Sequence, residues 1–265
     1  MADADARPPR PAAALLGADD PPPFTVVDGR ADGPFVLVSD HAGKRVPAAL
    51  RGLGLPPAEL ARHIGWDIGI AGTTVALAER LGAWAILQTY SRLVIDCNRP
   101  TGAASSIPAI SDGTPVPGNH GLDEAARARR IEAIFAPYHA RIAAELDARA
   151  AAGRPTLLVS MHSFTPAMAG VARPWHAGVL YGRDARLAHA LRDALAAEGD
   201  LCVGDNQPYA VSDATDYAVP VHGERRGLPH VAIEIRQDLI ADEAGQAAWA
   251  ARLARLFDRL GPRFA

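Results

Sequence analysis

The stretch Pro34 to Pro47, PFVLVSDHAGKRVP, determines the fold and the position of the site. Phe35 to Val38 is a compact apolar run, typical of a strand that is buried on both faces of a sheet. The run ends at Ser39-Asp40-His41, and Gly43 lets the backbone turn directly afterwards. Polar residues that follow a buried strand lie at the carboxyl edge of an α/β sheet, where ligands bind. His41 is therefore the first candidate functional residue.

Two later apolar runs also end in polar side chains. Thr156 to Val159 leads into Ser160-Met161-His162, and Val231 to Ile233 leads into Glu234. Because the carboxyl ends of parallel strands share one edge, we expect His41, His162 and Glu234 to meet there. Two histidines and a glutamate are the side chains that a metal-assisted hydrolase uses.

The segments between these strands have helical spacing of apolar residues. The pattern predicts helices over 56–63, 67–81, 123–151, 184–197 and 243–260, and further short strands over 24–28, 84–87, 93–95, 178–181 and 201–203. Pro137 is expected to kink or divide the long helix. Strands that alternate with helices predict an α/β fold: a three-layer α/β/α sandwich with a mixed, mainly parallel sheet.

Composition narrows the class of protein. The 265 residues suit one domain, which we expect over 24–265 behind a flexible leader at 1–23. A formal charge of −3 without a basic cluster argues against nucleic acid as a partner.

No run is long and apolar enough for a membrane span, and the leader lacks the pattern of a signal peptide, so we expect a cytoplasmic protein. Cys97 and Cys202 are expected to be buried free thiols.

The third ligand of a metal site is less directly indicated. A catalytic zinc site usually takes three protein ligands and leaves one position open. Asp67, in the segment HIGWD, is our choice because it precedes a helix that starts at the same sheet edge, although an N-cap role is an equal alternative. Asp40 is a weaker candidate because neighbouring residues on a strand point to opposite faces. Lys44 excludes an HxxE pairing with His41.

Glu234 and the block SRLVIDCNRP are the remaining catalytic candidates. An acidic residue in the apolar strand around Glu234 needs either a role as general base or an ion pair, for example with Arg236. Arg92 is a candidate to stabilise an oxyanion, with a structural salt bridge to Asp96 as the alternative. Asn98 and Arg99 are candidates to bind a substrate carboxylate through hydrogen bonds from the amide and the guanidinium.

The segment 100–121 is rich in Gly, Pro and Ser, and its length predicts a functional loop. A further long polar loop, over 204–227, is a candidate to close over a small ligand. In the second, Tyr217 and His222 are predicted substrate contacts. The other histidines are assigned structural roles: His63, His120, His139, His176, His189 and His230. Because the chain contains no GxGxxG, Walker or GxSxG motif, nucleotide cofactors and serine-hydrolase chemistry are not indicated.

The motifs VSDHAGKRVP, HIGWDIG, YSRLVIDCNRP, SMHSFTP, GDNQPYAVSDATDY, HGERRGLPH and IEIRQDLI together resemble the N-formylglutamate amidohydrolase family. The resemblance runs from about Val26 to Leu260, and more distantly it extends to zinc carboxypeptidases and aspartoacylases. It implies a phosphorylase/hydrolase-like α/β/α sandwich that hydrolyses a linear amide in an N-acyl amino acid. The chain also resembles the carboxypeptidases in the order of its site residues, which in those enzymes are a metal-binding histidine, an Asn-Arg pair that binds carboxylate, a second metal-binding histidine and a catalytic glutamate. Here the corresponding residues are His41, Asn98-Arg99, His162 and Glu234. The chain departs from the carboxypeptidases at Lys44, where the HxxE motif has a glutamate.

The resulting hypothesis is a metal-dependent amidohydrolase acting on N-formylglutamate or another N-acyl amino acid with an acidic side chain. His41, Asp67 and His162 would bind zinc or another divalent metal, Glu234 would activate water, and Arg92 would stabilise the oxyanion. Alternatives are an amidase or peptidase acting on a peptide-like or cell-wall substrate, and a metal-free small-molecule binding protein. The oligomeric state is not predicted.

Overall fold

The fold, seen in a computed structural model that describes residues 14–30 and 33–264, is built on one mixed seven-stranded sheet. Four parallel strands form its centre: β3 (Trp84–Gln88), β2 (Phe35–Ser39), β6 (Leu157–Phe164) and β11 (His230–Arg236). The outer strands are β1 (Phe24–Val27), antiparallel to β3, then β9 (Ala177–Leu180), antiparallel to β11, and β10 (Val203–Asp205), parallel to β9. The predicted mixed, mainly parallel sheet is confirmed.

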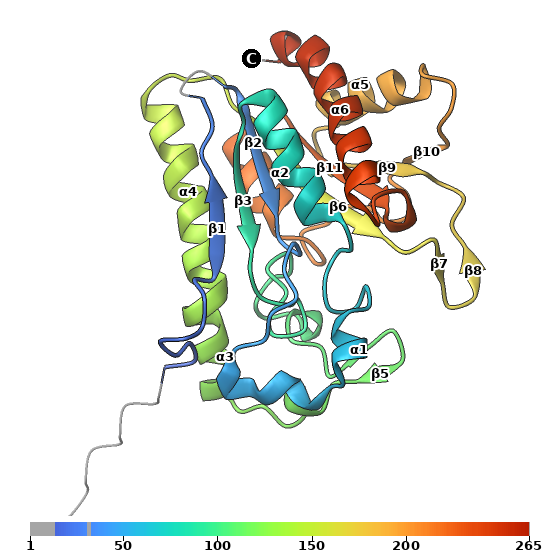
Figure 1. The fold of residues 1–265 in the computed structure, drawn as a ribbon. Coiled ribbons are helices and arrows are strands. Elements are labelled where there is room, and N and C mark those ends of the chain that lie inside the picture. The colour runs from blue at the N-terminus through green and yellow to red at the C-terminus, as the bar shows by residue number, and fades with distance from the viewer. Residues whose placement is uncertain (1–13, 31–32, 265) are drawn as a thin grey trace, which may run out of the picture.

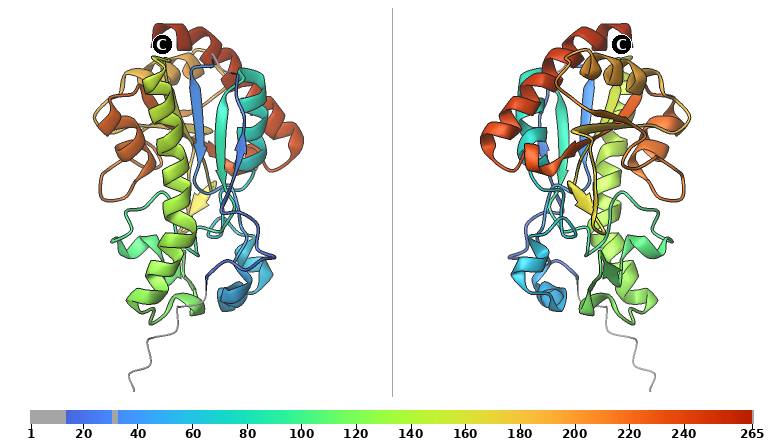
Figure 2. Two further views of the ribbon diagram at one scale, coloured as in Figure 1. Left: turned by 90° about the vertical axis from the view of Figure 1, so that its left-hand side faces the viewer. Right: turned by 90° about the vertical axis from the view of Figure 1, so that its right-hand side faces the viewer.

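Helices cover both faces of this sheet (Figures 1 and 2). One face carries α2 (Ile70–Leu81), α5 (Arg186–Ala196) and α6 (Glu243–Leu260). The other carries α4 (Ala136–Ala151), which is joined by a π-helical turn at Ile131–Phe135 to α3 (Glu124–Arg130), and α3 lies beyond the carboxyl end of the sheet (Figure 1). Pro137 therefore does not divide the predicted long helix. The π turn directly before it widens the helix and accommodates a residue without a backbone N–H.

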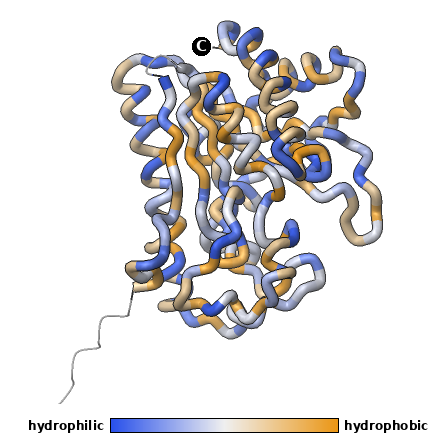
Figure 3. The backbone as a smooth tube through the Cα atoms, viewed as in Figure 1, coloured by the Kyte–Doolittle hydropathy of each residue, from blue (hydrophilic) through white to orange (hydrophobic). Residues whose placement is uncertain are grey.

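Side chains of the central strands alternate between two apolar cores. On β2, Leu37 packs with α2, α5 and α6, whereas Val36 and Val38 pack with α4. The tube in Figure 3 is accordingly hydrophobic along the central strands. On β6, Leu158 belongs to the α4-side core, so Ser160 and His162 continue the same face at the carboxyl half of the strand. The functional side chains are thus placed by strand alternation.

Smaller elements surround the carboxyl end of the sheet: α1 (Pro57–Leu60), β4 (Ile110–Ser111), β5 (Thr114–Pro115), β7 (Ala167–Met168) and β8 (Val171–Ala172). The predicted strand at 93–95 is wrong, because Leu93 and Val94 lie in a turn and Ile95 has no regular secondary structure. They are apolar because they are buried in the α4-side core. Arg130, 1 % exposed, fixes this segment through bonds to the carbonyls of Val94 (2.8 Å) and Gly118 (3.0 Å) and to Oδ1 of Asn119 (2.7 Å).

Two further expectations need revision. The predicted flexible leader lies outside the described residues over 1–13, but its later part packs on the domain. Leu15 is buried, and the Tyr90 hydroxyl donates to the carbonyl of Pro21 at 2.6 Å. Cys97 is buried as expected, whereas Cys202 is exposed.

In the described part of the chain, no helix has both the length and the apolar character needed to cross a membrane.

Candidate active site

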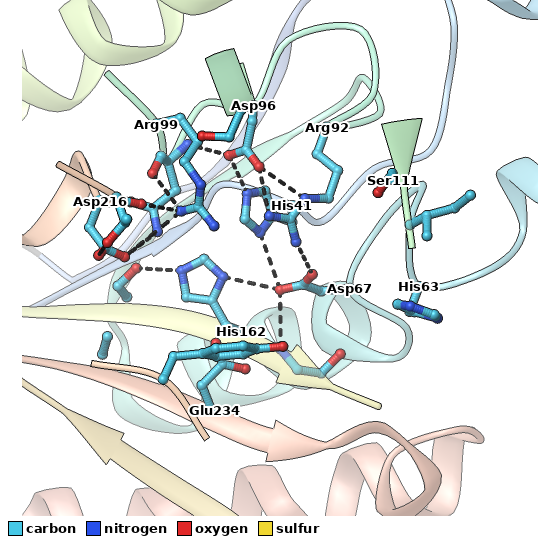
Figure 4. A pocket seen from close by; sticks show the side chains of 18 of the residues that line it. His41, His63, Asp67, Arg92, Asp96, Arg99, Ser111, His162, Asp216 and Glu234 are labelled. Atoms are coloured by element: carbon cyan, nitrogen blue, oxygen red, sulfur yellow. Dashed lines mark hydrogen bonds and ion pairs between the residues drawn. The ribbon is translucent and has the colours of Figure 1, made fainter. Parts of the chain in front are cut away.

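A cavity of about 580 Å³ lies at the carboxyl edge of the parallel strands (Figure 4). Its floor comes from β6 and β11, and its walls come from the segments around 63–67, 92–112 and 209–219. Nearly all the predicted site residues line it: His41, Asp67, Arg92, Asn98, Arg99, His162 and Glu234. Segments far apart in the sequence therefore converge on one space.

His41, Asp67 and His162 form a compact buried cluster. Their potential ligand atoms all lie within 4.8 Å of one another. Oδ2 of Asp67 lies 3.0 Å from Nδ1 of His162 and 3.4 Å from Nδ1 of His41. Helix α2 begins at Ile70 after Gly69, so Asp67 is not the N-cap of that helix. Its carboxylate instead faces the two imidazoles.

The far nitrogens of both imidazoles have partners of their own. Nε2 of His41 lies 2.7 Å from Oδ1 of Asp96, and Nε2 of His162 lies 2.9 Å from Oγ of Ser160. A protonated His41 donates to both carboxylates. When the ring is neutral and donates from Nε2 to Asp96, its Nδ1 carries a lone pair that can bind a metal, and imidazoles anchored in this way are typical of metal ligands.

Charge and burial act together on the cluster. Burial favours the neutral form of Asp67, but the charge of His41 and hydrogen bonds from His162 and His41 hold its pKa below the usual value. In Asp96, burial is likewise outweighed by Arg92 and His41, so the pKa of that carboxyl is lowered. Burial opposes protonation of His162, yet the hydrogen bond to Asp67 raises its pKa to about 9. The carboxyl groups of Asp67 and Asp96 are thus held in the ionised form.

Glu234 lies beside His162 on the neighbouring strand. The two residues are in register between β6 and β11, so their side chains share one face of the sheet. Glu234 is 7 % exposed, and its Oε2 has no hydrogen-bond partner among the described residues. Burial raises its pKa to about 7, against the effect of His162. Arg236 pairs with Asp238 instead (2.8 Å), so it is not the partner of Glu234.

Arg92 has the predicted salt bridge and also lines the cavity. Its Nε and Nη2 donate to Oδ2 of Asp96 at 2.9 and 2.6 Å, and its Nη1 lies 3.4 Å from Oδ1 of Asp67. Burial would lower the pKa of Arg92, but Asp96 and Asp67 raise it, so the guanidinium remains charged. Arg92 therefore links the cluster to the cavity wall.

Asn98 and Arg99 fasten the loop over 215–218 to the site. Oδ1 of Asn98 accepts the backbone N–H groups of Tyr217 and Ala218, both at 3.0 Å. Nη1 of Arg99 donates to the carbonyl oxygens of Asn98 (3.0 Å) and Thr215, and it lies 3.9 Å from Asp216. The side-chain oxygen of Asn98 is thus used for structure, whereas Arg99 keeps donors that face the cavity.

Tyr217 and His222 do not line the cavity, in contrast to the predicted substrate contacts. They pack behind the site with Phe135 and His139; Nε2 of His222 lies 3.0 Å from Nδ1 of His139. Burial lowers the pKa of His139 to about 3 and that of His222 to about 4. The two side chains therefore contact the π-helical turn and α4 instead of the cavity.

The cavity is also lined by residues for which the sequence does not predict a role in the site. His63, predicted to be structural, lines the cavity with Nε2 3.2 Å from Oδ2 of Asp112. Tyr209 and Asp216, within the predicted ligand loop, also line the cavity. For Asp96 the sequence predicts only a salt bridge to Arg92. The proximity of His63 to Asp67 in the sequence was the one available signal.

Comparison with known proteins identifies the relatives of this chain. A family model described as N-formylglutamate amidohydrolase matches residues 33–241. The crystal structure of a gene product of Agrobacterium tumefaciens is 36 % identical, with a TM-score of 0.90, covering 94 % of this chain and 98 % of that one. An N-formylglutamate amidohydrolase from Ralstonia eutropha is 20 % identical, with a TM-score of 0.66, covering 91 % and 98 %. Comparison with curated proteins gave no match.

Proposed function

The chain belongs to the N-formylglutamate amidohydrolase family, hydrolases that act on amides, and on that premise we propose that it hydrolyses the amide bond of an N-formyl or other N-acyl amino acid, such as N-formylglutamate. The single observation that carries the proposal is the convergence of His41, Asp67, His162 and Glu234 in one cavity. Each residue type suits one part of metal-assisted amide hydrolysis.

The cluster fits a divalent metal, and zinc is our proposal for its identity. Two imidazole nitrogens and one carboxylate oxygen form a usual ligand set for catalytic zinc, and the anchored Nε2 atoms support this use. A bound metal would act as a Lewis acid on the amide carbonyl and on water. Lys44 stands where an HxxE motif would have its glutamate, and its Nζ lies over the ring of Trp66, 4.5 Å from the centroid. Because position 44 offers no carboxylate, Asp67 is the third metal ligand in this proposal.

Glu234 is the proposed general base. A carboxylate with a pKa near neutrality can take a proton from water and return it to the leaving nitrogen. Its free Oε2 is available for this transfer. Arg92 is the proposed donor to the developing oxyanion, and Arg99, positioned by Asn98, is the proposed partner of a substrate carboxylate.

Metal removal tests the proposal directly. The purified protein should contain a divalent ion, and dialysis against a chelator should abolish release of free amino acid from N-formylglutamate. Added zinc should then restore the activity. Elemental analysis paired with the amine assay measures both effects, and full activity in metal-free protein would contradict the mechanism. A protein that neither contains nor takes up metal would instead favour the metal-free binding protein.

One observation favours a second candidate, an amidase acting on a longer, peptide-like substrate. The three large apolar residues that are exposed in the described chain are Ile110 (62 %), Val171 (69 %) and Tyr209 (41 %). Ile110 and Tyr209 line the cavity, and Val171 pairs with Met168, which also lines it. A substrate that extends beyond the mouth would cover them. Faster hydrolysis of N-formyl dipeptides than of N-formyl amino acids would favour this candidate.

A further inference from the structure

The cavity offers few positive charges to an anionic substrate. Its lining contains more carboxylates than guanidinium groups: Asp67, Asp96, Asp112, Asp216 and Glu234 accompany Arg92 and Arg99. Arg92 is held by two of these carboxylates, so its charge is largely neutralised. Arg99 can therefore serve one substrate carboxylate, but a second carboxylate needs another cation.

The candidate for this cation is Arg173, which does not itself line the cavity but contacts Tyr209, a residue that does. Its Nη1 donates to the hydroxyl of Tyr209 at 2.9 Å, and Tyr209 lines the cavity. Its Cζ lies 5.0 Å from the ring centroid of Tyr209 and 5.9 Å from that of Phe164, which is buried. The backbone N–H of Arg173 donates to the carbonyl of Pro166 at 2.8 Å. Both the backbone and the guanidinium are thus fixed before a ligand binds.

The guanidinium of Arg173 lacks a carboxylate partner. Within the described part of the chain, no Asp or Glu oxygen lies within 4.0 Å of it. Arginines close to it in sequence or around the cavity differ: Arg62 pairs with Glu59, Arg183 with Asp213, and Arg236 with Asp238. A preorganised guanidinium without a counter-charge is well suited to bind a carboxylate from a ligand.

Arg173 and Arg99 are held at different points of the loop that contributes to the cavity wall. Arg99 donates to the carbonyl oxygen of Thr215 and lies 3.9 Å from Asp216, whereas Arg173 contacts the side chain of Tyr209. Figure 4 shows Arg99 on one side of His41, Asp67 and His162. The two guanidinium groups can therefore meet two different groups of one ligand.

We propose that Arg173, held by Tyr209, binds the second carboxylate of a dicarboxylic N-acyl amino acid, whereas Arg99 binds the first. The inference rests on the proposed function and narrows it to substrates with an acidic side chain. The hydroxyl of Tyr209 adds a second donor beside the guanidinium. Arg173 is a specificity-determining residue in this arrangement and takes no part in proton transfer.

A pair of substrates of equal shape tests this role. N-formyl-L-glutamate and N-formyl-L-glutamine differ at one group, a carboxylate against an amide. The wild-type protein should prefer glutamate, and Arg173→Met should remove roughly ten- to a hundredfold of that preference, mainly through KM. Arg173→Lys should retain part of it, because the charge remains. Arg186→Met, which removes an exposed arginine paired with Asp184, is the matched control and should keep the wild-type preference.

The outcomes separate this inference from the proposed function. If Arg173→Met slows both substrates equally, Arg173 only supports Tyr209, and the specificity role is overturned. If the wild-type protein hydrolyses neither compound, the proposed function fails, and calorimetric binding of the same two compounds then tests Arg173. Tighter binding of the glutamate compound that is lost in Arg173→Met supports the inference. Equal binding of both compounds by the wild-type protein overturns it.

Discussion

Nε2 of His41 lies 2.7 Å from Oδ1 of Asp96, while the other oxygen of the same carboxylate accepts two hydrogen bonds from Arg92. One buried carboxylate therefore orients a metal-ligand imidazole and a cavity-lining guanidinium together. Asp96 is itself fixed, because its Oδ1 accepts the backbone N–H of Asn98 at 2.9 Å. The geometry of the ligand cluster and that of the substrate pocket are thus coupled through this residue.

Asp96→Asn is predicted to weaken metal binding. The amide loses the charge that holds the Nε2–H tautomer of His41, and loss of such an outer partner typically costs about 10- to 100-fold in metal affinity. Competition with a chromophoric chelator measures the affinity without reference to activity. Asp112→Asn, which alters a cavity carboxylate outside the ligand cluster, is the control. Wild-type affinity in Asp96→Asn would show that the contact does not orient His41.

Glu234→Gln is predicted to separate binding from turnover. Glutamine keeps the size of the side chain but cannot accept a proton, so kcat should fall by about a hundredfold or more. Metal content and binding of N-formylglutamate should be retained, because Glu234 is not part of the ligand cluster. Single-turnover kinetics with metal analysis checks both statements. A turnover number near that of the wild type would exclude the general-base role.

The buried His139–His222 pair is predicted to lower stability in acid. Both pKa values lie below the ordinary value of 6.5, at about 3 and about 4, so the folded protein keeps both rings neutral. Below about pH 6.5 the unfolded chain binds protons that the folded chain does not, and stability therefore falls as the pH is lowered toward 4. The expected loss is a few kcal/mol at pH 4.

Urea unfolding at several pH values tests this dependence. His139→Gln should be less stable than the wild type at pH 7.5 but should show a flatter decline between pH 6.5 and 4. His120→Gln, which replaces an exposed histidine, should follow the wild-type curve. An unchanged slope in His139→Gln would mean that other groups cause the acid sensitivity.

Much of the fold and of the site follows from local sequence patterns. The apolar runs before His41, His162 and Glu234 identify buried parallel strands, and parallel strands bring their carboxyl ends to one edge. Asp67 could be predicted because it precedes α2 at that edge. These inferences need only strand alternation and chain direction, which the sequence specifies directly.

Loop residues were harder to assign because their side chains are oriented by distant contacts. Tyr217 looked like a ligand contact, but its ring packs on Phe135 and His139, which are about 80 residues away in the chain. The sequence does not indicate a role for Arg173, because its position depends on the ring of Tyr209, which belongs to another loop. Composition marks such loops as polar without indicating which side chains face the cavity.

Arg130→Met is predicted to destabilise both the fold and the site. The substitution leaves the carbonyls of Val94 and Gly118 without this donor beneath the loop that carries Asp96 and Arg99, at an expected cost of about 3 kcal/mol. Because that loop would loosen, kcat/KM should fall as well. Urea unfolding and steady-state kinetics measure the two effects. Arg129→Met, on the same helix, should change stability by less than about 0.5 kcal/mol. Equal stability of the two variants would show that the buried guanidinium does not hold the loop.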